Sequence, residues 1–362
     1  MIDLNEIKQL VEMDSQAILS LYLRVDPALD ENQAPTPAWR IWLKNALRDL
    51  DKTVPADQQT QWITLRDQAV QFLSSYGNHT KGLVLFFGEG IAKTYELPIR
   101  PEQNDAKFGE PLIAPLLWIL DEYERYLIVL VDKEEAHFLS TYLGTIEREE
   151  AMASDRFSFD FREKTLMPRP TGTDAGGGQI TGGSHRDAFA DKMDAFIAKF
   201  HHDVADRIDR LMGQIGADRV IIGGSEQSAQ AIARSIHDTT RQHLAGVAAI
   251  PFELGDAEVM NRVIPVALNY ERQKEIEIVN RVIDWAKSGG RAVLGSEDVQ
   301  KALNEQRVEL IVAPWPPEDT AKLDAMTVAA LRNNSPVELV GGEAAERLRE
   351  NGQIAAQLYF VS

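Results

Sequence analysis

Short apolar runs alternate with amphipathic helical patterns along most of this 362-residue chain. The alternation is most regular after residue 290, where strand-like runs and helical patterns of about ten residues follow one another. Apolar strands in such an order need helices to cover the faces of their sheet, which is an α/β arrangement. The sequence therefore predicts an α/β fold, and a chain of this length predicts more than one domain.

We place domain boundaries where the pattern changes, which gives domains at 1–122, 123–258 and 259–362. The first domain is an N-terminal α/β unit with a strand at 17–25 and a β-hairpin around Glu89-Gly90. In each of the three domains strand-like runs lie next to helical patterns. We therefore expect three α/β domains.

The middle domain opens with a predicted hairpin, 126–131 and 136–142, and continues through an irregular stretch that ends at Gly183. A long helix follows from Ser184, with apolar positions at spacings of three and four. Further strands are predicted at 219–222 and 247–252. The third domain begins with a long charged helix that ends near Lys287, followed by the regular strand–helix alternation.

Composition excludes several classes of protein. The chain has no cysteine, which excludes disulfide scaffolds, thiolate zinc sites and cysteine nucleophiles. Its formal net charge is −18, so repulsion from phosphate opposes general coating of nucleic acid, and RNA contact requires local basic patches. No apolar run reaches 18 residues, and the N-terminus resembles an acidic helix rather than a signal peptide. We expect a cytoplasmic protein without a membrane partner, monomeric when free.

Glycine makes up six of the 12 residues from Gly172 to Gly183, directly before the predicted long helix. One hypothesis is a phosphate-binding loop that would serve a nucleotide-binding regulator, but Gly183 stands at the lysine position and no strand precedes the loop. A second is a solvated tether, since glycine loses much entropy on ordering. The third is a GGQ tip at Gly177, Gly178 and Gln179.

A GGQ tip has a chemical rationale. Two glycines let the backbone approach RNA where larger side chains would clash. A glutamine side chain positions water, and its backbone N–H stabilises a developing oxyanion. An aminoacyl ester is already activated, so water attack depends more on geometry than on a strong base.

In order along the chain, several segments resemble the class-1 peptide release factor of eukaryotes and archaea, its paralogue Pelota, and their bacterial relatives. The resemblance covers nearly the whole chain and lies in the following segments: 17–25 with 82–88 (GLVLFFG), 126–144, the Gly177-Gly178-Gln179 tripeptide, 219–225 (RVIIGGS), 291–312 with its G-x-[ED]-D-x-x-x-A-L pattern, and 352–360.

The resemblance implies a tRNA-shaped, three-domain protein that enters the A site of the 70S ribosome. The N-terminal domain would face the decoding centre, the middle domain the peptidyl-transferase centre and P-site tRNA, and the C-terminal domain a translational GTPase such as elongation factor Tu. By the same match, Gln179 is the catalytic candidate for peptidyl-tRNA hydrolysis, with Gly177 and Gly178 shaping the loop. It implies no cofactor.

The chain also departs from the family's pattern. The codon-reading motifs NIKS and Y-x-C-x-x-x-F are absent, and Ile180 to Gly183 are inserted between GGQ and the helix. The sequence therefore predicts a codon-independent factor. It leaves open whether that factor rescues ribosomes by hydrolysis or occupies the vacant A site without catalysis as a hibernation factor.

Two groups of basic residues are candidates for RNA contact. Arg40, Lys44 and Arg48 recur at i, i+4 and i+8, and we expect them to form a stripe opposite the apolar face of their helix. Near the GGQ the candidates are Arg169, His185 and Arg186, within a stretch whose local charge is positive. Solvation of the surface is the simpler alternative for both groups.

Two other patterns predict no site. His202 and Asp206 share a helical face, but two ligands are too few for zinc, so we predict no metal site. Ser225 lacks the G-x-S-x-G elbow of a hydrolase nucleophile, because Gln227 replaces the last glycine.

Overall fold

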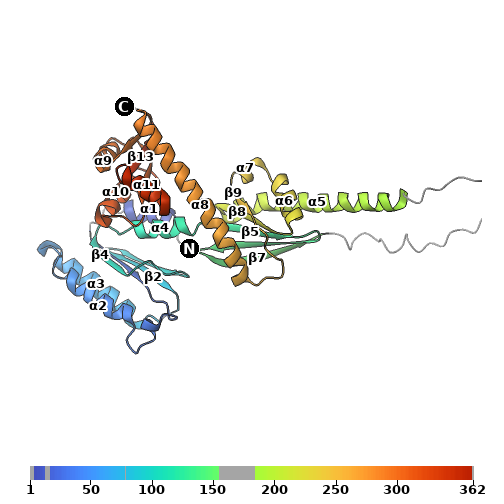
Figure 1. The fold of residues 1–362 in the computed structure, drawn as a ribbon. Helices are drawn as coiled ribbons and strands as arrows, with labels where there is room; N and C mark the ends of the chain where they lie inside the picture. Colours follow the sequence, from blue (N-terminus) through green and yellow to red (C-terminus); the bar gives the residue numbers. More distant parts are fainter. Residues whose placement is uncertain (1–3, 13–16, 78, 155–183, 361–362) are drawn as a thin grey trace, which may run out of the picture. The chain divides into compact units, whose positions relative to one another are not determined.

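The computed structural model describes residues 4–12, 17–77, 79–154 and 184–360, with side chains of the helix that starts at Ser184 described from residue 193. The chain divides into two compact units. The first joins Met1–Tyr123 to Glu271–Ser362, and the second is Glu124–Tyr270. Figure 1 shows the elements of both units, which are mixed α/β, so the predicted fold class is confirmed.

An antiparallel four-stranded sheet of order β3-β2-β1-β4 forms the N-terminal part of the first unit. Its strands are β1 (Ile18–Leu23), β2 (Gly82–Gly88), β3 (Ile91–Leu97) and β4 (Asp105–Gly109). Helices α2 (Ala38–Leu50) and α3 (Gln59–Ser75) cover one face, preceded by short 3₁₀ turns η1 (Asp30–Asn32) and η2 (Ala56–Gln58). Trp39 and Trp62, almost fully buried, anchor the two helices on β1 and β2.

The C-terminal part of the first unit has its own four-stranded sheet, of order β10-β13-β11-β12. Its strands are β10 (Ala292–Leu294), β11 (Val308–Pro314), β12 (Val337–Val340) and β13 (Ala355–Leu358). Helices α9 (Ser296–Asn304), α10 (Thr320–Arg332) and α11 (Gly342–Glu350) alternate with them, as the sequence predicts. Asp319 caps α10 by accepting a hydrogen bond from the Lys322 N–H at 3.0 Å. The pattern was predictable because each apolar run is short and each helix amphipathic.

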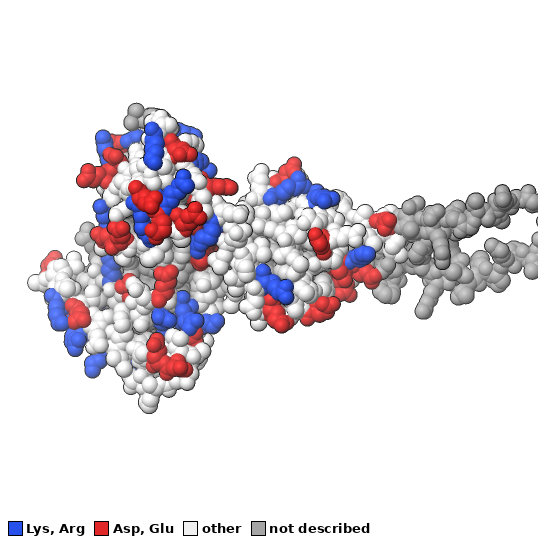
Figure 2. Space-filling view, in the orientation of Figure 1, with Lys and Arg blue, Asp and Glu red and all other residues white. Residues whose placement is uncertain are grey.

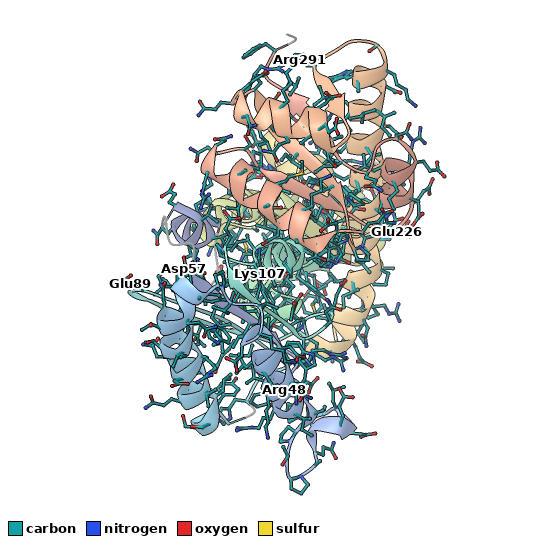
Figure 3. The ribbon with its side chains drawn as sticks, turned by 90° about the vertical axis from the view of Figure 1, so that its left-hand side faces the viewer. Arg48, Asp57, Glu89, Lys107, Glu226 and Arg291 are labelled. Atoms are coloured by element: carbon teal, nitrogen blue, oxygen red, sulfur yellow. The ribbon has the colours of Figure 1, made fainter. Side chains whose placement is uncertain are left out.

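A buried carboxylate joins the two parts of the first unit. Asp324 of α10 is fully buried, and its Oδ1 accepts hydrogen bonds from the N–H groups of Ile113 (2.7 Å) and Ala114 (3.2 Å). These donors lie at the start of α4 (Ala114–Glu122), where the helix dipole favours a negative charge. Lys107 of β4 pairs with the same carboxylate, and Figure 3 shows its position among the elements. Helix α1 (Leu4–Glu12) also packs on α10.

The second unit is built on a five-stranded sheet of order β7-β6-β5-β8-β9. Its strands are β5 (Tyr126–Val131), β6 (Glu135–Tyr142), β7 (Thr145–Ala153), β8 (Arg219–Gly224) and β9 (Leu244–Val247). The predicted β5–β6 hairpin is confirmed, and β8 lies parallel to β5. Helices α5 (Ser184–Ile215), α6 (Glu226–Ser235) and α7 (Asp238–Arg241) follow, and the first part of α8 (Asp256–Lys287) completes the unit.

The last strand of the second unit differs from the prediction. The sequence predicts a strand at 247–252, but β9 is Leu244–Val247 and residues 248–255 form no strand. Pro251 has no N–H to donate to a ladder, and the final backbone bond runs from Ala248 to the Ile222 carbonyl at 2.9 Å. The apolar residues of this segment therefore pack on the core from a loop and not from a strand.

The domain boundaries at 122/123 and 258/259 stay a prediction. The second of them lies in the first turn of α8, which continues into the first unit. Within the described part of the chain, no helix combines the length and the apolar character that crossing a bilayer requires.

Gly224 at the end of β8 has a backbone that other residues rarely adopt. Its φ is +105°, and a Cβ placed there would lie 2.0 Å from the Val131 carbonyl oxygen of β5. The Ser225 N–H donates to this same carbonyl at 2.9 Å. The close approach of β8 to β5 therefore requires glycine at this position.

We expect Gly224→Ala to destabilise the second unit by about 3 kcal/mol or more, because strain and a backbone clash add. Gly213→Ala is the matched control: a Cβ at Gly213 of α5 meets nothing within 4 Å, and alanine should stabilise the helix by about 0.5–1 kcal/mol. Thermal unfolding followed by circular dichroism measures both. Equal stability of the two variants would contradict the requirement for glycine at position 224.

Glu275 of α8 is the buried acid of an ionic network within the first unit. Its carboxylate accepts from Arg272 at 2.5 Å and from the Gly341 N–H at 3.2 Å, while Arg272 also pairs with Glu122 at 2.8 Å. Burial raises the pKa of Glu275 to about 7, against the opposing effect of Arg272. The folded state therefore holds a proton that the unfolded state has already released between about pH 4.5 and 7.

From this pKa we expect the Glu275 contribution to stability to fall as pH rises from about 4.5 to 7, because in this window the native state binds more protons than the unfolded state. Glu275→Gln removes the slope, so the variant gains stability relative to wild type as pH rises. All six tryptophans lie in the first unit, so urea unfolding followed by their fluorescence reports on it. A difference between variant and wild type that does not change with pH would contradict the raised pKa.

Candidate functional site

The predicted catalytic residues cannot be placed in the structure. Gly177, Gly178 and Gln179, and the candidate Arg169, lie outside the described residues. His185 and Arg186 lie in the first turn of α5, but their side chains are not among those described. Their roles remain predictions from the sequence.

Helix α5 follows the GGQ segment in the sequence. Among its described side chains, which begin at Met193, the first that is buried is Phe200, and those from Met193 to Lys199 are exposed or half-buried. From Ser184 to Phe200 an α-helix spans about 24 Å at 1.5 Å per residue. Figure 1 shows this part of α5 extending beyond the sheet of its unit. The backbone at the start of α5 therefore lies well away from the core of the second unit.

The packed half of α5 is fixed to β7, the strand that precedes the same segment. Arg207 donates two hydrogen bonds of 2.7 Å to the two carboxylate oxygens of Glu150. This bidentate pair lowers the pKa of Glu150 and raises that of Arg207. This ion pair therefore connects β7 and α5, the two elements that flank residues 155–183.

A groove between α2 and α3 contains the other predicted RNA contacts. It has a volume of about 400 Å³, and its lining includes all three residues of the predicted stripe, Arg40, Lys44 and Arg48. From α3 it adds Arg66, which the sequence analysis missed because a helix pattern does not reveal which cation of a neighbouring helix faces it. Figure 2 shows Lys and Arg gathered at the edge of the molecule formed by α2 and α3, and Figure 3 shows Arg48 on α2.

The four cations of the groove differ in how many contacts each already makes within the protein. Arg40 donates to the Tyr76 carbonyl at 3.0 Å and lies 4.6 Å from the Trp39 ring centroid. Arg66 bonds Asp51 and Asp67, and its hydrogen bond to Asp67 is the main cause of its raised pKa.

Lys44 and Arg48 are exposed. Within the described residues Lys44 forms no ion pair, and Arg48 only approaches Asp49 at 3.9 Å. These two side chains are the ones free to meet phosphate.

The position of the stripe differs from the prediction. The sequence predicts it opposite the apolar face of α2, but Lys44 and Arg48 line the same groove as Leu43 and Leu47. The reason is that successive side chains of a helix are rotated by only about 100° around its axis. A cation that directly follows a core leucine therefore lies at the border of the core. The groove therefore combines an apolar floor with a cationic rim.

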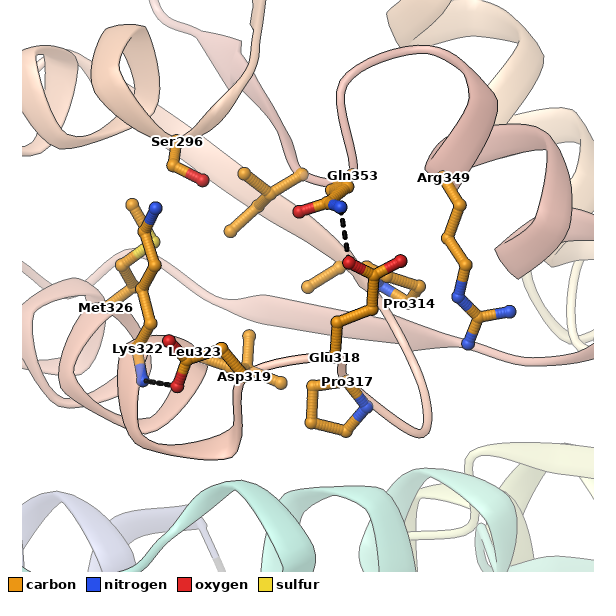
Figure 4. Close-up of a pocket in the computed structure, with 12 residues that line it drawn as sticks. Ser296, Pro314, Pro317, Glu318, Asp319, Lys322, Leu323, Met326, Arg349 and Gln353 are labelled. Carbon is orange, nitrogen blue, oxygen red and sulfur yellow. Dashed lines mark hydrogen bonds between the residues drawn. The ribbon is translucent and has the colours of Figure 1, made fainter.

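A second pocket, of about 430 Å³, lies at the carboxyl end of β11 (Figure 4). This edge of a sheet is where α/β domains commonly bind ligands. Several of its polar side chains already have partners: Gln353 donates to Glu318, and Asp319 caps α10. Arg349 donates to Glu346 and to the Pro316 carbonyl. Ser296 and Lys322 complete the polar part of the lining.

The minor patterns of the sequence also form no site. The described residues contain no group of three or more His, Cys, Asp or Glu that could hold a metal ion. Ser225 accepts a hydrogen bond from the Ser228 N–H at 3.3 Å as the N-cap of α6. Burial lowers the pKa of His201, which packs beside Phe200 in the core half of α5.

Part of the chain matches a known family model. Residues 111–268 match the family model described as bacterial archaeo-eukaryotic release factor family 10. The matched range includes β5 to β9, the GGQ tripeptide and the start of α8. The predicted resemblance to bacterial relatives of the archaeal and eukaryotic release factor and Pelota is thereby confirmed. A comparison with curated proteins found no match.

Solved structures of translation factors show distant similarity to this chain. An archaeal translation termination factor, aRF1, is 18% identical over 99% of both chains, with a TM-score of 0.26. Dom34 of S. cerevisiae, described as a translation termination-like factor that interacts with Hbs1, is 12% identical over 77% of this chain and 80% of its own, with a TM-score of 0.47. Archaeal Pelota bound to the ribosome is 15% identical over 99% and 94%, with a TM-score of 0.45.

We expect the double variant Lys44→Gln/Arg48→Gln to bind 70S ribosomes about tenfold more weakly near physiological salt, with the slope of log affinity against log salt reduced by about two. Sedimentation or filter binding at several salt concentrations measures this. Lys301→Gln/Arg347→Gln, two exposed cations of α9 and α11, is the control with the same charge change. An equal loss in the control would contradict a specific role of the groove.

Proposed function

We propose that this protein is a release factor/Pelota-like translation factor that binds the ribosomal A site without reading a codon and rescues ribosomes by hydrolysing peptidyl-tRNA. The observation that carries the proposal is the family match over 111–268, which includes Gly177-Gly178-Gln179. The cationic groove of α2 and α3 supports it with a surface suited to phosphate. The part of α5 before Phe200 is consistent with it, because its backbone extends beyond the sheet and directly follows the GGQ segment in the sequence.

In this proposal Gln179 positions a water molecule against the ester that joins the peptide to the tRNA. The water oxygen attacks the ester carbonyl carbon, the bond to the ribose oxygen breaks, and the water proton ends on the released ribose hydroxyl. The backbone N–H of Gln179 stabilises the oxyanion that forms on the carbonyl oxygen. Gly177 and Gly178 let the backbone approach the ester closely. Delivery by a translational GTPase such as elongation factor Tu, through the C-terminal part of the first unit, belongs to the same proposal.

A second candidate is a hibernation factor that occupies the vacant A site without catalysis. The insertion of Ile180 to Gly183 after the GGQ and the missing codon-reading motifs favour it. Both candidates require ribosome binding, and they differ in whether peptide is released.

The deciding experiment uses purified 70S ribosomes with labelled peptidyl-tRNA in the P site. We expect the protein to release peptide and Gln179→Ala to reduce the rate by at least about 100-fold while ribosome binding persists, because the loss concerns the chemical step. Gln230→Ala, an exposed glutamine of α6, is the control that should release peptide normally.

Two results would decide against rescue. Tight binding to empty ribosomes without any release supports hibernation. Failure to bind 70S particles at both low and physiological salt excludes both candidates, since phosphate contacts are strongest at low salt.

A further inference from the structure

A second cavity of the first unit lies apart from the groove of α2 and α3. Its volume is about 240 Å³, somewhat below that of sites for drug-sized ligands, which leaves room only for a small molecule. Its walls come from β1, from the segment before β4, from α4 and from the loop between β11 and α10. The two sequence-distant parts of the unit thus build it together.

Two tryptophans form its aromatic wall. The rings of Trp118 in α4 and Trp315 after β11 stack with centroids 5.6 Å apart and an interplanar angle of 16°. Trp315 is held in place because its Nε1–H donates to Glu102 Oε2 at 2.9 Å. Arg272 lies 5.7 Å from the Trp118 centroid, so one ring of the pair already holds a cation. Prolines 101, 115, 316 and 317 extend this apolar surface.

The only charged residues among those that line the cavity are Glu102 and Asp105. Glu102 uses Oε2 for Trp315, and Asp105 uses Oδ1 for the Ala106 N–H at 2.8 Å. Their other oxygens accept no hydrogen bond from the described residues, and no lysine or arginine of that part of the chain pairs with either. Glu102 is exposed and Asp105 half-buried, so each carboxylate presents an oxygen to a ligand at the mouth of the aromatic cavity.

We propose that this cavity binds a small organic ammonium ion, with its charged nitrogen at Glu102 and Asp105 and its alkyl body against Trp118, Trp315 and the prolines. The carboxylates accept charge-assisted hydrogen bonds from the ammonium group, and the rings favour cations. An anion is repelled. A bare metal ion is not held, because no cluster of three or more ligating side chains exists in the described residues.

The binding is tested with spermidine as the probe, by isothermal titration calorimetry at about 150 mM salt, where weak surface attraction to an acidic protein is screened. We expect saturable binding of one equivalent, a change in tryptophan fluorescence, and a higher unfolding temperature of the first unit. A neutral diol of similar length, 1,8-octanediol, should not bind comparably.

The variants Glu102→Gln and Asp105→Asn keep an oxygen for Trp315 and for the Ala106 N–H, so both should fold. We expect each to weaken spermidine binding by roughly tenfold, the effect of losing one charged hydrogen-bond acceptor. Glu89→Gln, at the exposed tip of the β2–β3 hairpin, has the same charge change and should bind as wild type (Figure 3). Absence of saturable binding, or equal weakening by Glu89→Gln, would overturn the proposal.

Discussion

The carboxylate of Asp324 is the interaction on which the first unit depends. A fully buried charge is tolerated only when it is paired and hydrogen-bonded, and Asp324 has both the Lys107 ammonium and two backbone N–H donors of the Ile113–Ala114 turn. Burial raises its pKa, against the opposing effects of Lys107 and the two backbone donors. Its donors come from β4 and the start of α4 while the acid comes from α10, so this group links the two parts of the unit, together with the Glu102–Trp315 and Arg272–Glu122 contacts. The stacked tryptophans and the cavity beside them depend on that arrangement.

The two surfaces that we assign to ligands follow from opposite local charges within one acidic chain. On α2 and α3 the exposed cations follow core leucines, which creates a groove with an apolar floor and a positive rim. Beside α4 two carboxylates lie against tryptophan and proline, which creates a negative aromatic cavity. The net charge of −18 predicts neither of these two surfaces, because recognition depends on the local electrostatic field rather than on the total charge.

Elements with a clear hydrophobic period could be predicted from the sequence, and those without one could not. The alternation after residue 290, the β5–β6 hairpin and the long helix from Ser184 were predicted because apolar residues recur at strand or helix spacing. β7 was missed because its exposed face carries charges such as Arg148 and Glu149 and no residue of the strand is fully buried. The strand at 247–252 was wrong because Pro251 ends the ladder, a local effect that overrides apolar content.

Of the candidate site, the sequence identified the cations of α2 but not their neighbour Arg66, nor the Glu102–Trp315 contact, because both depend on packing between distant segments.

The first unit draws its residues from both ends of the chain, with the second unit inserted between them. During synthesis, Lys107 and the α4 amides emerge more than 200 residues before their acid, Asp324. Until α10 with Asp324 has left the exit tunnel, the early segment lacks the partners that contact β4 and α4 in the folded unit. Contacts of such long sequence separation slow folding and leave the nascent chain open to chaperones and proteases. A protein of this construction is complete only when its final helices are made, so premature termination yields a product that cannot close its first unit.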